Sequence, residues 1–160
     1  MREIIQKLIK PVATAECALA ITEDGGVIFV RLQPGTGDVP RFIGRSGATV
    51  RALKALVEYA APDNKVVRFS LGDGIQSPAP VPVPRNEKWR PDDIVEIVEA
   101  YLDEIGEPAA VQTVAQTDGW LLILAAVMPR EVWDALSRWI TVMALSTGGY
   151  AALEPYDVAQ

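Results

Sequence analysis

The sequence lacks several residue types on which common kinds of protein chemistry depend. It contains no histidine, which removes the commonest general base, the commonest zinc ligand and every Ser-His-Asp or Cys-His catalytic arrangement. Cys17 is the single cysteine, so no internal disulfide and no cysteine-based metal site can form. We therefore expect a protein that is not an enzyme, with no catalytic residue, no metal site and no cofactor.

Long hydrophobic runs are also absent. The longest uninterrupted apolar run, Trp120 to Met128, has nine residues, whereas a membrane-spanning helix needs about 20. Met1 is followed by an amphipathic pattern and not by the uniform apolar stretch of a signal peptide. Apolar residues still make up 49% of the 160 residues, ample for a packed core. We expect a soluble, cytoplasmic protein without a membrane partner.

The net charge of -6 conceals an asymmetry between the two halves of the chain. Residues 1–70 hold ten Lys and Arg against seven Asp and Glu, a net charge of +3, and residues 71–160 hold five against fourteen, a net charge of -9. Because net charge bears on the kind of partner a surface can attract, the two halves are expected to do different work.

A proline-rich stretch at residues 77–84 divides the sequence. Alternating prolines fix φ and remove hydrogen-bond donors, so this stretch is expected to be an extended, semi-rigid linker. The sequence therefore predicts a first domain over residues 1–72, a linker over 73–91 and an acidic α/β interaction domain over 92–160.

The first half reads as an α+β unit. An apolar helical stripe runs from Ile4 to Ile9, and Asp24-Gly25-Gly26 is a hairpin turn signal. Val27, Phe29 and Arg31 are expected on one face of the second strand, and Ile28, Val30 and Leu32 on the other. Further along, Asp38 can cap a short helix through Ile43. The expected order is α-β-β-α-α-β, with strands at 13–21, 27–32 and 65–71 and a long helix at 48–61.

The second half repeats much of this pattern. Pro91 and Asp92 begin a helix, Asp118-Gly119 joins two strands, and a helix from Pro129 to Leu145 precedes a last strand near Tyr150. The expected order is α-β-β-α-β, which is the first unit without one helix and its loop. Three tryptophans are expected in the core: Trp120, Trp133 and Trp139. Trp89, beside Lys88 and Arg90, is expected either to stack on a base or to pack across the two halves.

The segment Ile43-Gly44-Arg45-Ser46-Gly47 carries the clearest functional signal. Two glycines without Cβ atoms let a loop adopt positive φ and approach a sugar-phosphate backbone closely. The helix that follows presents the positive end of its dipole and free N–H groups, expected at about Ala48 and Thr49. Arg45 and Ser46 add a cation and a hydroxyl.

In this setting the sequence resembles the KH family of RNA-binding domains, over about residues 1–71. The resemblance is carried by residues 30–53, centred on Gly44-Arg45-Ser46-Gly47, and by the opening Leu8-Ile9-Lys10-Pro11. It is closest to the small single-KH proteins of bacteria, with the prokaryotic-type order α-β-β-α-α-β. It implies that the glycine loop clamps about four nucleotides of single-stranded nucleic acid, with Ile43 lining an apolar groove.

Local charge agrees with this resemblance. The segment from Arg31 to Lys54 contains five cations and a single anion, Asp38. The candidate nucleic-acid-binding residues are Arg41, Ile43, Gly44, Arg45, Ser46, Gly47, Thr49 and Arg51.

Two functions from different classes follow from these observations. The first is single-stranded RNA binding, as an RNA chaperone or post-transcriptional regulator, with residues 92–160 available for a protein partner or for self-association. These residues are compatible with a degenerate KH-like unit that lacks the clamp. The alternative, favoured by the overall acidity, is a KH-like scaffold that binds protein and no nucleic acid.

Overall fold

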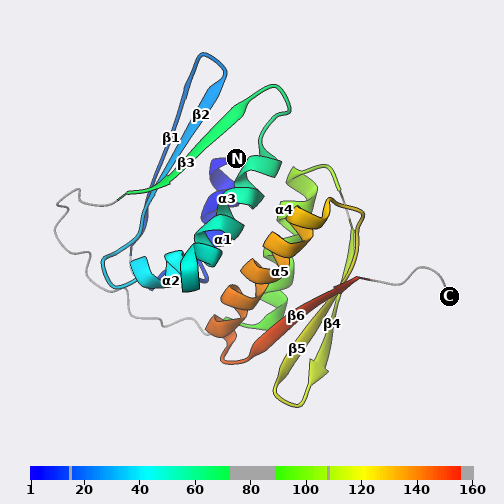
Figure 1. Ribbon diagram of the computed structural model, residues 1–160. Helices are drawn as coiled ribbons and strands as arrows, with labels where there is room; N and C mark the ends of the chain where they lie inside the picture. Colours follow the sequence, from blue (N-terminus) through cyan, green and yellow to red (C-terminus); the bar gives the residue numbers. More distant parts are fainter. Residues whose placement is uncertain (15, 73–88, 108, 156–160) are drawn as a thin grey trace.

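The structure is a computed structural model that describes residues 1–14, 16–72, 89–107 and 109–155. Within these residues the chain is a mixed α+β protein with five α-helices and two three-stranded sheets. The helices lie between the two sheets (Figure 1). The proline-rich stretch expected at 77–84 lies outside the described residues, as does most of the expected linker. No described helix has both the length and the apolar character needed to cross a membrane.

The first half has the expected order of helices and strands. Its sheet has the strand order β1-β2-β3, in which β1 and β2 are antiparallel and β2 and β3 are parallel. Helices α2 and α3 form the crossover between the two parallel strands. The elements are α1 (Arg2–Ile9), β1 (Ala18–Asp24), β2 (Val27–Gln33), α2 (Val39–Ile43), η1 (Arg45–Gly47), α3 (Ala48–Ala60) and β3 (Val66–Leu71).

The hairpin between β1 and β2 confirms the expected turn. Gly25 and Gly26 have φ values of 55° and 82°, the positive values that a two-residue turn of this kind requires. The expected alternation along β2 is confirmed as well. Ile28, Val30 and Leu32 are buried against the helices, and Phe29 on the opposite face is 45% exposed.

The first strand begins later than the sequence suggested, at Ala18 and not at Ala13. The N–H group of Ala13 donates to the carbonyl of Ile9 and so continues the turn that ends α1. The N–H and hydroxyl groups of Thr14 both donate to Asp38. These bonds hold the segment beside α1 and α2, and the strand forms only after it.

The second half also has the expected order, α-β-β-α-β. Its sheet has the order β4-β5-β6, again with an antiparallel hairpin followed by a parallel pair. Asp93 accepts the backbone N–H of Arg90 at 2.7 Å and so caps the first helix. The elements are α4 (Pro91–Glu104), β4 (Ala110–Gln116), β5 (Gly119–Ala125), α5 (Arg130–Ala144), η2 (Leu145–Thr147) and β6 (Tyr150–Pro155).

The two halves pack through equivalent helices. Helix α3 contacts α5, its counterpart in the second half, and α1 contacts its counterpart α4. Like-with-like contact is the pattern of a two-fold, isologous interface, here within one chain. The buried apolar residues of both halves form one continuous cluster, so the helical layer is a shared core.

Two buried hydrogen bonds also cross this interface, one from α5 to α1 and one from α4 to α3. Trp139 of α5 donates its indole N–H to the carbonyl of Leu8 at 3.0 Å, and Tyr101 of α4 donates its hydroxyl to the carbonyl of Leu56 at 2.7 Å. Trp139 also lies near Phe42 of α2, with ring centroids 6.3 Å apart. Each aromatic side chain therefore buries its ring and satisfies its polar atom across the interface.

The remaining tryptophans also pack. Trp120 is 6% exposed, and Trp133 is half-buried against the core. Trp89 is half-buried too, and the ammonium of Lys10 lies 5.9 Å from its ring centroid. Trp89 thus contacts the first half, which is the cross-half packing that was one of its two expected roles.

Candidate nucleic-acid interface

The loop of residues 44–47 joins α2 to α3 through the single turn η1. Gly44 has φ 70° and ψ 179°, and Gly47 has φ 72° and ψ 14°. Ser46 between them also has a positive φ, 53°, and is the only described non-glycine residue that does. Both glycines therefore occupy conformations that other residues adopt only with strain, as the loop signature suggested.

Gly44 is required for a second reason, which is its contact with Thr49. A Cβ atom at Gly44 would lie 2.1 Å from the Thr49 Oγ1 atom and 2.7 Å from its Cβ atom. No flexible side chain can move aside to relieve this contact, because Thr49 is 3% exposed at the start of α3. The Thr49 side chain, a candidate ligand contact, is thus buried against the backbone of the loop.

Two of the candidate arginines bind the backbone around the loop. Arg51 donates from a guanidinium nitrogen to the carbonyl of Ser46 at 2.8 Å, and Arg41 donates to the carbonyl of Val12 at 3.1 Å. The first bond ties α3 to the loop that precedes it, and the second ties α2 to the end of α1. These cations hold the loop in place, and each retains further N–H donors.

The exposed part of the loop consists of Ile43, Arg45 and Ser46. Ile43 is 39% exposed, although large aliphatic side chains are usually buried. Arg45 and Ser46 are both exposed. Arg45 has no hydrogen bond or ion pair with any described residue. The loop thus presents a free cation and a hydroxyl beside an apolar side chain, a combination suited to a phosphate and a base.

Asp38 anchors α2 in a different way from the one expected. It occupies the N-cap position but makes no side-chain capping bond. Its carboxylate instead accepts the Thr14 N–H at 2.7 Å and the Thr14 hydroxyl, and the side chain is only 2% exposed. The single anion of the basic segment is therefore buried and satisfied, which keeps it away from the exposed face of the loop.

The N-terminus of α3 differs from the expectation at one atom. The N–H of Ala48, expected to be free, donates to the carbonyl of Arg45. The tight turn η1 uses this donor internally, as 3₁₀ turns at helix ends commonly do. The positive end of the helix dipole still lies directly behind Arg45 and Ser46.

The second half has no counterpart of this loop. Four residues, Ala126 to Pro129, connect β5 to α5 and contain neither glycine nor cation. Val127 in this connection is 89% exposed. Glu131 lies in the first turn of α5, so the helix dipole there faces a carboxylate that belongs to the chain itself.

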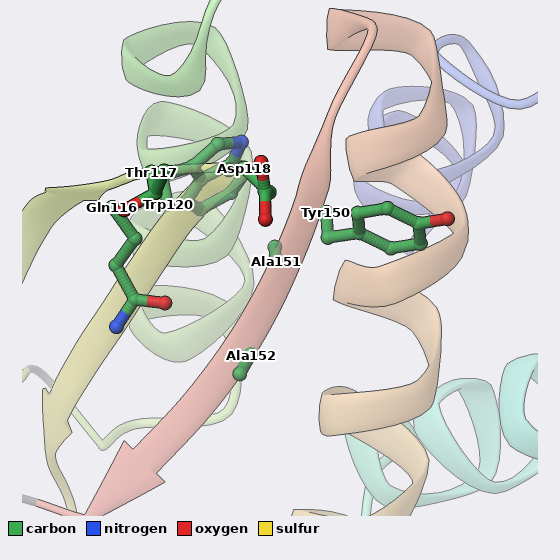
Figure 2. Close-up of a pocket in the computed structure, with 8 residues that line it drawn as sticks. Gln116, Thr117, Asp118, Trp120, Tyr150, Ala151 and Ala152 are labelled. Carbon is green, nitrogen blue, oxygen red and sulfur yellow. The ribbon is translucent and has the colours of Figure 1, made fainter.

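A shallow depression on the second half was not expected from the sequence (Figure 2). It forms where the β4–β5 turn meets the start of β6, and a Cβ atom at Gly119 would lie 2.3 Å from the carbonyl oxygen of Tyr150. Its lining contains one carboxylate and no cation, which does not suit a polyanion. The lining residues are Gln116, Thr117, Asp118, Gly119, Trp120, Tyr150, Ala151 and Ala152.

Two titratable side chains of the described residues have a raised pKa. Burial, with a smaller contribution from the charge of Asp38, raises the pKa of Cys17 to about 12. Burial also raises the pKa of Tyr101, with Tyr59 adding to the shift. Both side chains are thereby kept neutral at pH 7, the opposite of what an activated nucleophile or base requires. No described group of three or more His, Cys, Asp or Glu side chains is placed to hold a metal ion.

Comparison of the sequence with protein-family models and with curated proteins found no match. The geometry of the loop and the distribution of charge around it are therefore the observations that bear on function. Those two properties separate the first half of the chain from the second.

Proposed function

We propose that this chain has a KH-type fold in its first half and binds single-stranded RNA through residues 44–47 and the adjacent Ile43. The observation that carries the proposal is the loop itself. It combines two glycines at positive φ, an exposed and unpaired Arg45, and the N-terminal end of a 13-residue helix. Loops of this kind clamp about four nucleotides of a single strand in KH domains.

The supporting geometry is that of a held loop with an open outer surface. Arg51 and the buried contact between Gly44 and Thr49 fix its backbone from behind. Only Arg45, Ser46 and Ile43 face outward, so ligand binding requires little rearrangement, which lowers its entropic cost. Arg45 and Ser46 would contact phosphate, and Ile43 would contact a base. The arrangement favours a binding protein, such as an RNA chaperone or post-transcriptional regulator in the cytoplasm.

The alternative is a KH-like scaffold that binds a protein and no nucleic acid. The net charge of -9 over residues 71–160 favours it. On this reading the loop is structural, and the acidic half carries the partner or a second copy of the chain. The two functions differ in what happens when the loop alone is changed.

The test is a titration of a labelled single-stranded RNA of about five nucleotides by fluorescence anisotropy at low salt. The double variant Arg45→Asp/Ser46→Asp replaces a cation and a hydroxyl with two anions on exposed positions. It should fold as the parent does, because aspartate tolerates the positive φ of Ser46, and it should lose measurable binding. Binding is lost because the two added carboxylates repel the phosphates of the RNA.

The matched control is Arg130→Asp/Val127→Asp. It makes the same change in net charge at two highly exposed positions before and at the start of α5. The control should bind RNA within about twofold of the parent, because exposed charges more than a Debye length away are largely screened. Equal binding by the loop variant and the parent would show that the loop is not the clamp, and no binding by the parent would favour the scaffold.

A further inference from the structure

The outer face of the first sheet carries an exposed aromatic ring between cations. Helices cover the inner face of this sheet, and no described element covers its outer face (Figure 1). Phe29 lies on the central strand β2, directly between Thr22 of β1 and Arg68 of β3. Two residues further along β2, Arg31 lies on the same face, between Ala20 and Ser70. In the other direction along β2 the next row consists of Asp24, Val27 and Val66, of which Val66 is 58% exposed, so the face carries two arginines against one aspartate.

Neither arginine is engaged with a side chain elsewhere. Arg31 and Arg68 are exposed and form no hydrogen bond or ion pair with any described residue. The guanidinium of Arg31 reaches the end of β3, where a Cβ atom at Gly72 would lie 3.2 Å from the Arg31 Nε atom. The carboxylate of Glu23, on the neighbouring strand, is already paired with Lys65. Two free cations therefore flank the exposed ring of Phe29.

The equivalent face of the second sheet is different. Its residues include Val114, Leu121 and Ala152, which lie side by side across β4, β5 and β6. The next row is Gln112, Ile123 and Glu154. The three described strands of this sheet contain no lysine or arginine. The combination of an exposed ring with cations is thus confined to the half of the chain that also carries the glycine loop.

We propose that the outer face of the first sheet is a second contact surface for single-stranded RNA, separate from the loop. An unpaired base stacks on the ring of Phe29, and the guanidinium groups of Arg31 and Arg68 bind the phosphates on either side. Aromatic rings with nearby cations on a groove or sheet are a general means of binding single strands without strong sequence preference.

The charge of this face favours RNA over a second copy of the chain as its ligand. A symmetric dimer through this face would bring the arginines of one copy close to the same arginines of the other, and like charges in an interface are costly. Phe29 and Val66 are the exposed large apolar side chains of this face in the described strands, which is little apolar surface for a stable protein interface. A polyanion with exposed bases satisfies both the ring and the cations.

The test compares RNA strands of two lengths. A strand of about 20 nucleotides can reach both surfaces, whereas one of about five nucleotides occupies the tighter of them. Phe29→Ala should weaken binding of the long strand about tenfold, in line with the loss of one stacked base, and should leave binding of the short strand within about twofold. Tyr150→Ala is the matched control, because it removes a 69% exposed ring from the second sheet. It should leave the affinity for both the long and the short strand unchanged.

Arg68→Gln tests the cationic part of the surface. It should reduce the magnitude of the slope of log affinity against log salt by about 0.7 for the long strand, the value for one phosphate contact. Arg130→Gln, which removes an exposed cation from the second half, should leave the slope unchanged. Long-strand binding that is insensitive to both Phe29→Ala and Arg68→Gln would overturn the proposal.

The loop variant separates this proposal from the proposed function. In the Arg45→Asp/Ser46→Asp background, residual binding of the long strand should remain and should fall further with Phe29→Ala. If the loop variant binds the short strand as the parent does while Phe29→Ala still weakens the long strand, the clamp is wrong and the sheet surface stands. If the parent binds neither strand at low salt, both are wrong.

Discussion

The two halves of this chain share a topology and differ in their surfaces. Each has a helix, an antiparallel hairpin and a parallel third strand reached through a helical crossover. The first half inserts α2 and a glycine loop before its crossover helix, and the second connects β5 to α5 directly. The net charges, +3 and -9, have opposite signs. The two halves thus share the helices and strands that pack together, and they differ in the loops and charges of their surfaces.

The comparison indicates that the second half supplies structure to the first. Equivalent helices pack against each other and bury one continuous cluster of apolar side chains. A unit of about 70 residues has a marginal core by itself, and here the second half adds apolar residues to one continuous core. Under the proposed function, the loop and the outer sheet face of the first half are then left for the ligand.

The largest expected effect follows from removing one half. A fragment of residues 1–72 would expose Leu8, Leu53 and Leu56, which are fully buried in the intact chain. We expect it to be unfolded or aggregated at room temperature, because it loses the apolar contacts of the shared core and a domain is typically stable by only about 5–15 kcal/mol. Circular dichroism and size-exclusion chromatography measure this. A monomeric fragment with a cooperative thermal transition would show that the first half folds without the second, contrary to this expectation.

A smaller effect is expected at the centre of the interface. Trp139→Ala removes a fully buried ring and its hydrogen bond to Leu8, and large-to-small changes of this kind cost about 3–5 kcal/mol. Trp133→Ala, on the same helix but half-buried, should cost clearly less. Urea denaturation gives both values. Equal losses would indicate that α5 does not pack through the Trp139 face.

The hydroxyl of Tyr101 allows one hydrogen bond across the interface to be tested by itself. Tyr101→Phe deletes the bond to the Leu56 carbonyl and keeps the ring, so the expected loss is about 1–2 kcal/mol of unfolding free energy. Tyr59→Phe is the control, because Tyr59 is 36% exposed and should change the stability by less than about 0.5 kcal/mol. A neutral Tyr101→Phe variant would mean that the hydrogen bond across the interface contributes nothing net.

The loop can be tested against a glycine of similar φ in the other half. Gly44 and Gly106 have φ values of 70° and 75°, but only Gly44 has an atom in the way of a Cβ. Gly106→Ala should cost about 1–2 kcal/mol for its backbone conformation alone. Gly44→Ala should cost more and should weaken RNA binding, because Thr49 or the loop must move. Similar costs with unchanged RNA binding would remove the argument that Gly44 and Thr49 fix the clamp.

A last test concerns the reactivity of Cys17, which reports on local opening of the first half. Because burial raises the pKa of its thiol to about 12, the reactive thiolate is scarce at neutral pH, whereas a free cysteine has a pKa of about 8.5. Alkylation by iodoacetamide at about pH 8 should be at least about 100-fold slower in the folded protein than in denaturant. Comparable rates would show that the region beside Asp38 opens readily.

Much of the fold could be predicted from the sequence because its signals are local. Helical stripes, the Asp24-Gly25-Gly26 turn and the loop glycines each specify the backbone within a few residues, and the order of elements followed. The late start of β1 could not be read in this way. It depends on the bonds between Thr14 and Asp38, which are 24 positions apart, and an aspartate before a helix is normally a cap.

The packing of the two halves was also beyond the local pattern. An apolar stripe shows that a helix face is buried but not what covers it. Helix α3 illustrates this, because its buried residues are Thr49, Ala52, Leu53, Leu56 and Val57, whereas the sequence predicts a stripe of Val50, Leu53, Leu56, Val57 and Ala60. Likewise, the sequence placed Arg41 and Arg51 in a basic segment, but only the structure shows that both bind backbone carbonyls, whereas Arg45 in the loop binds no described residue.

The most direct test of the central claim, that the loop of the first half binds single-stranded RNA, is the salt dependence of binding of a short strand. Affinity is measured at several salt concentrations for the parent, Arg45→Gln and Arg130→Gln. The account predicts that the parent binds, that Arg45→Gln reduces the magnitude of the log–log slope by about 0.7, and that Arg130→Gln leaves it unchanged. Identical slopes for all three proteins, or no binding by the parent at low salt, would contradict it.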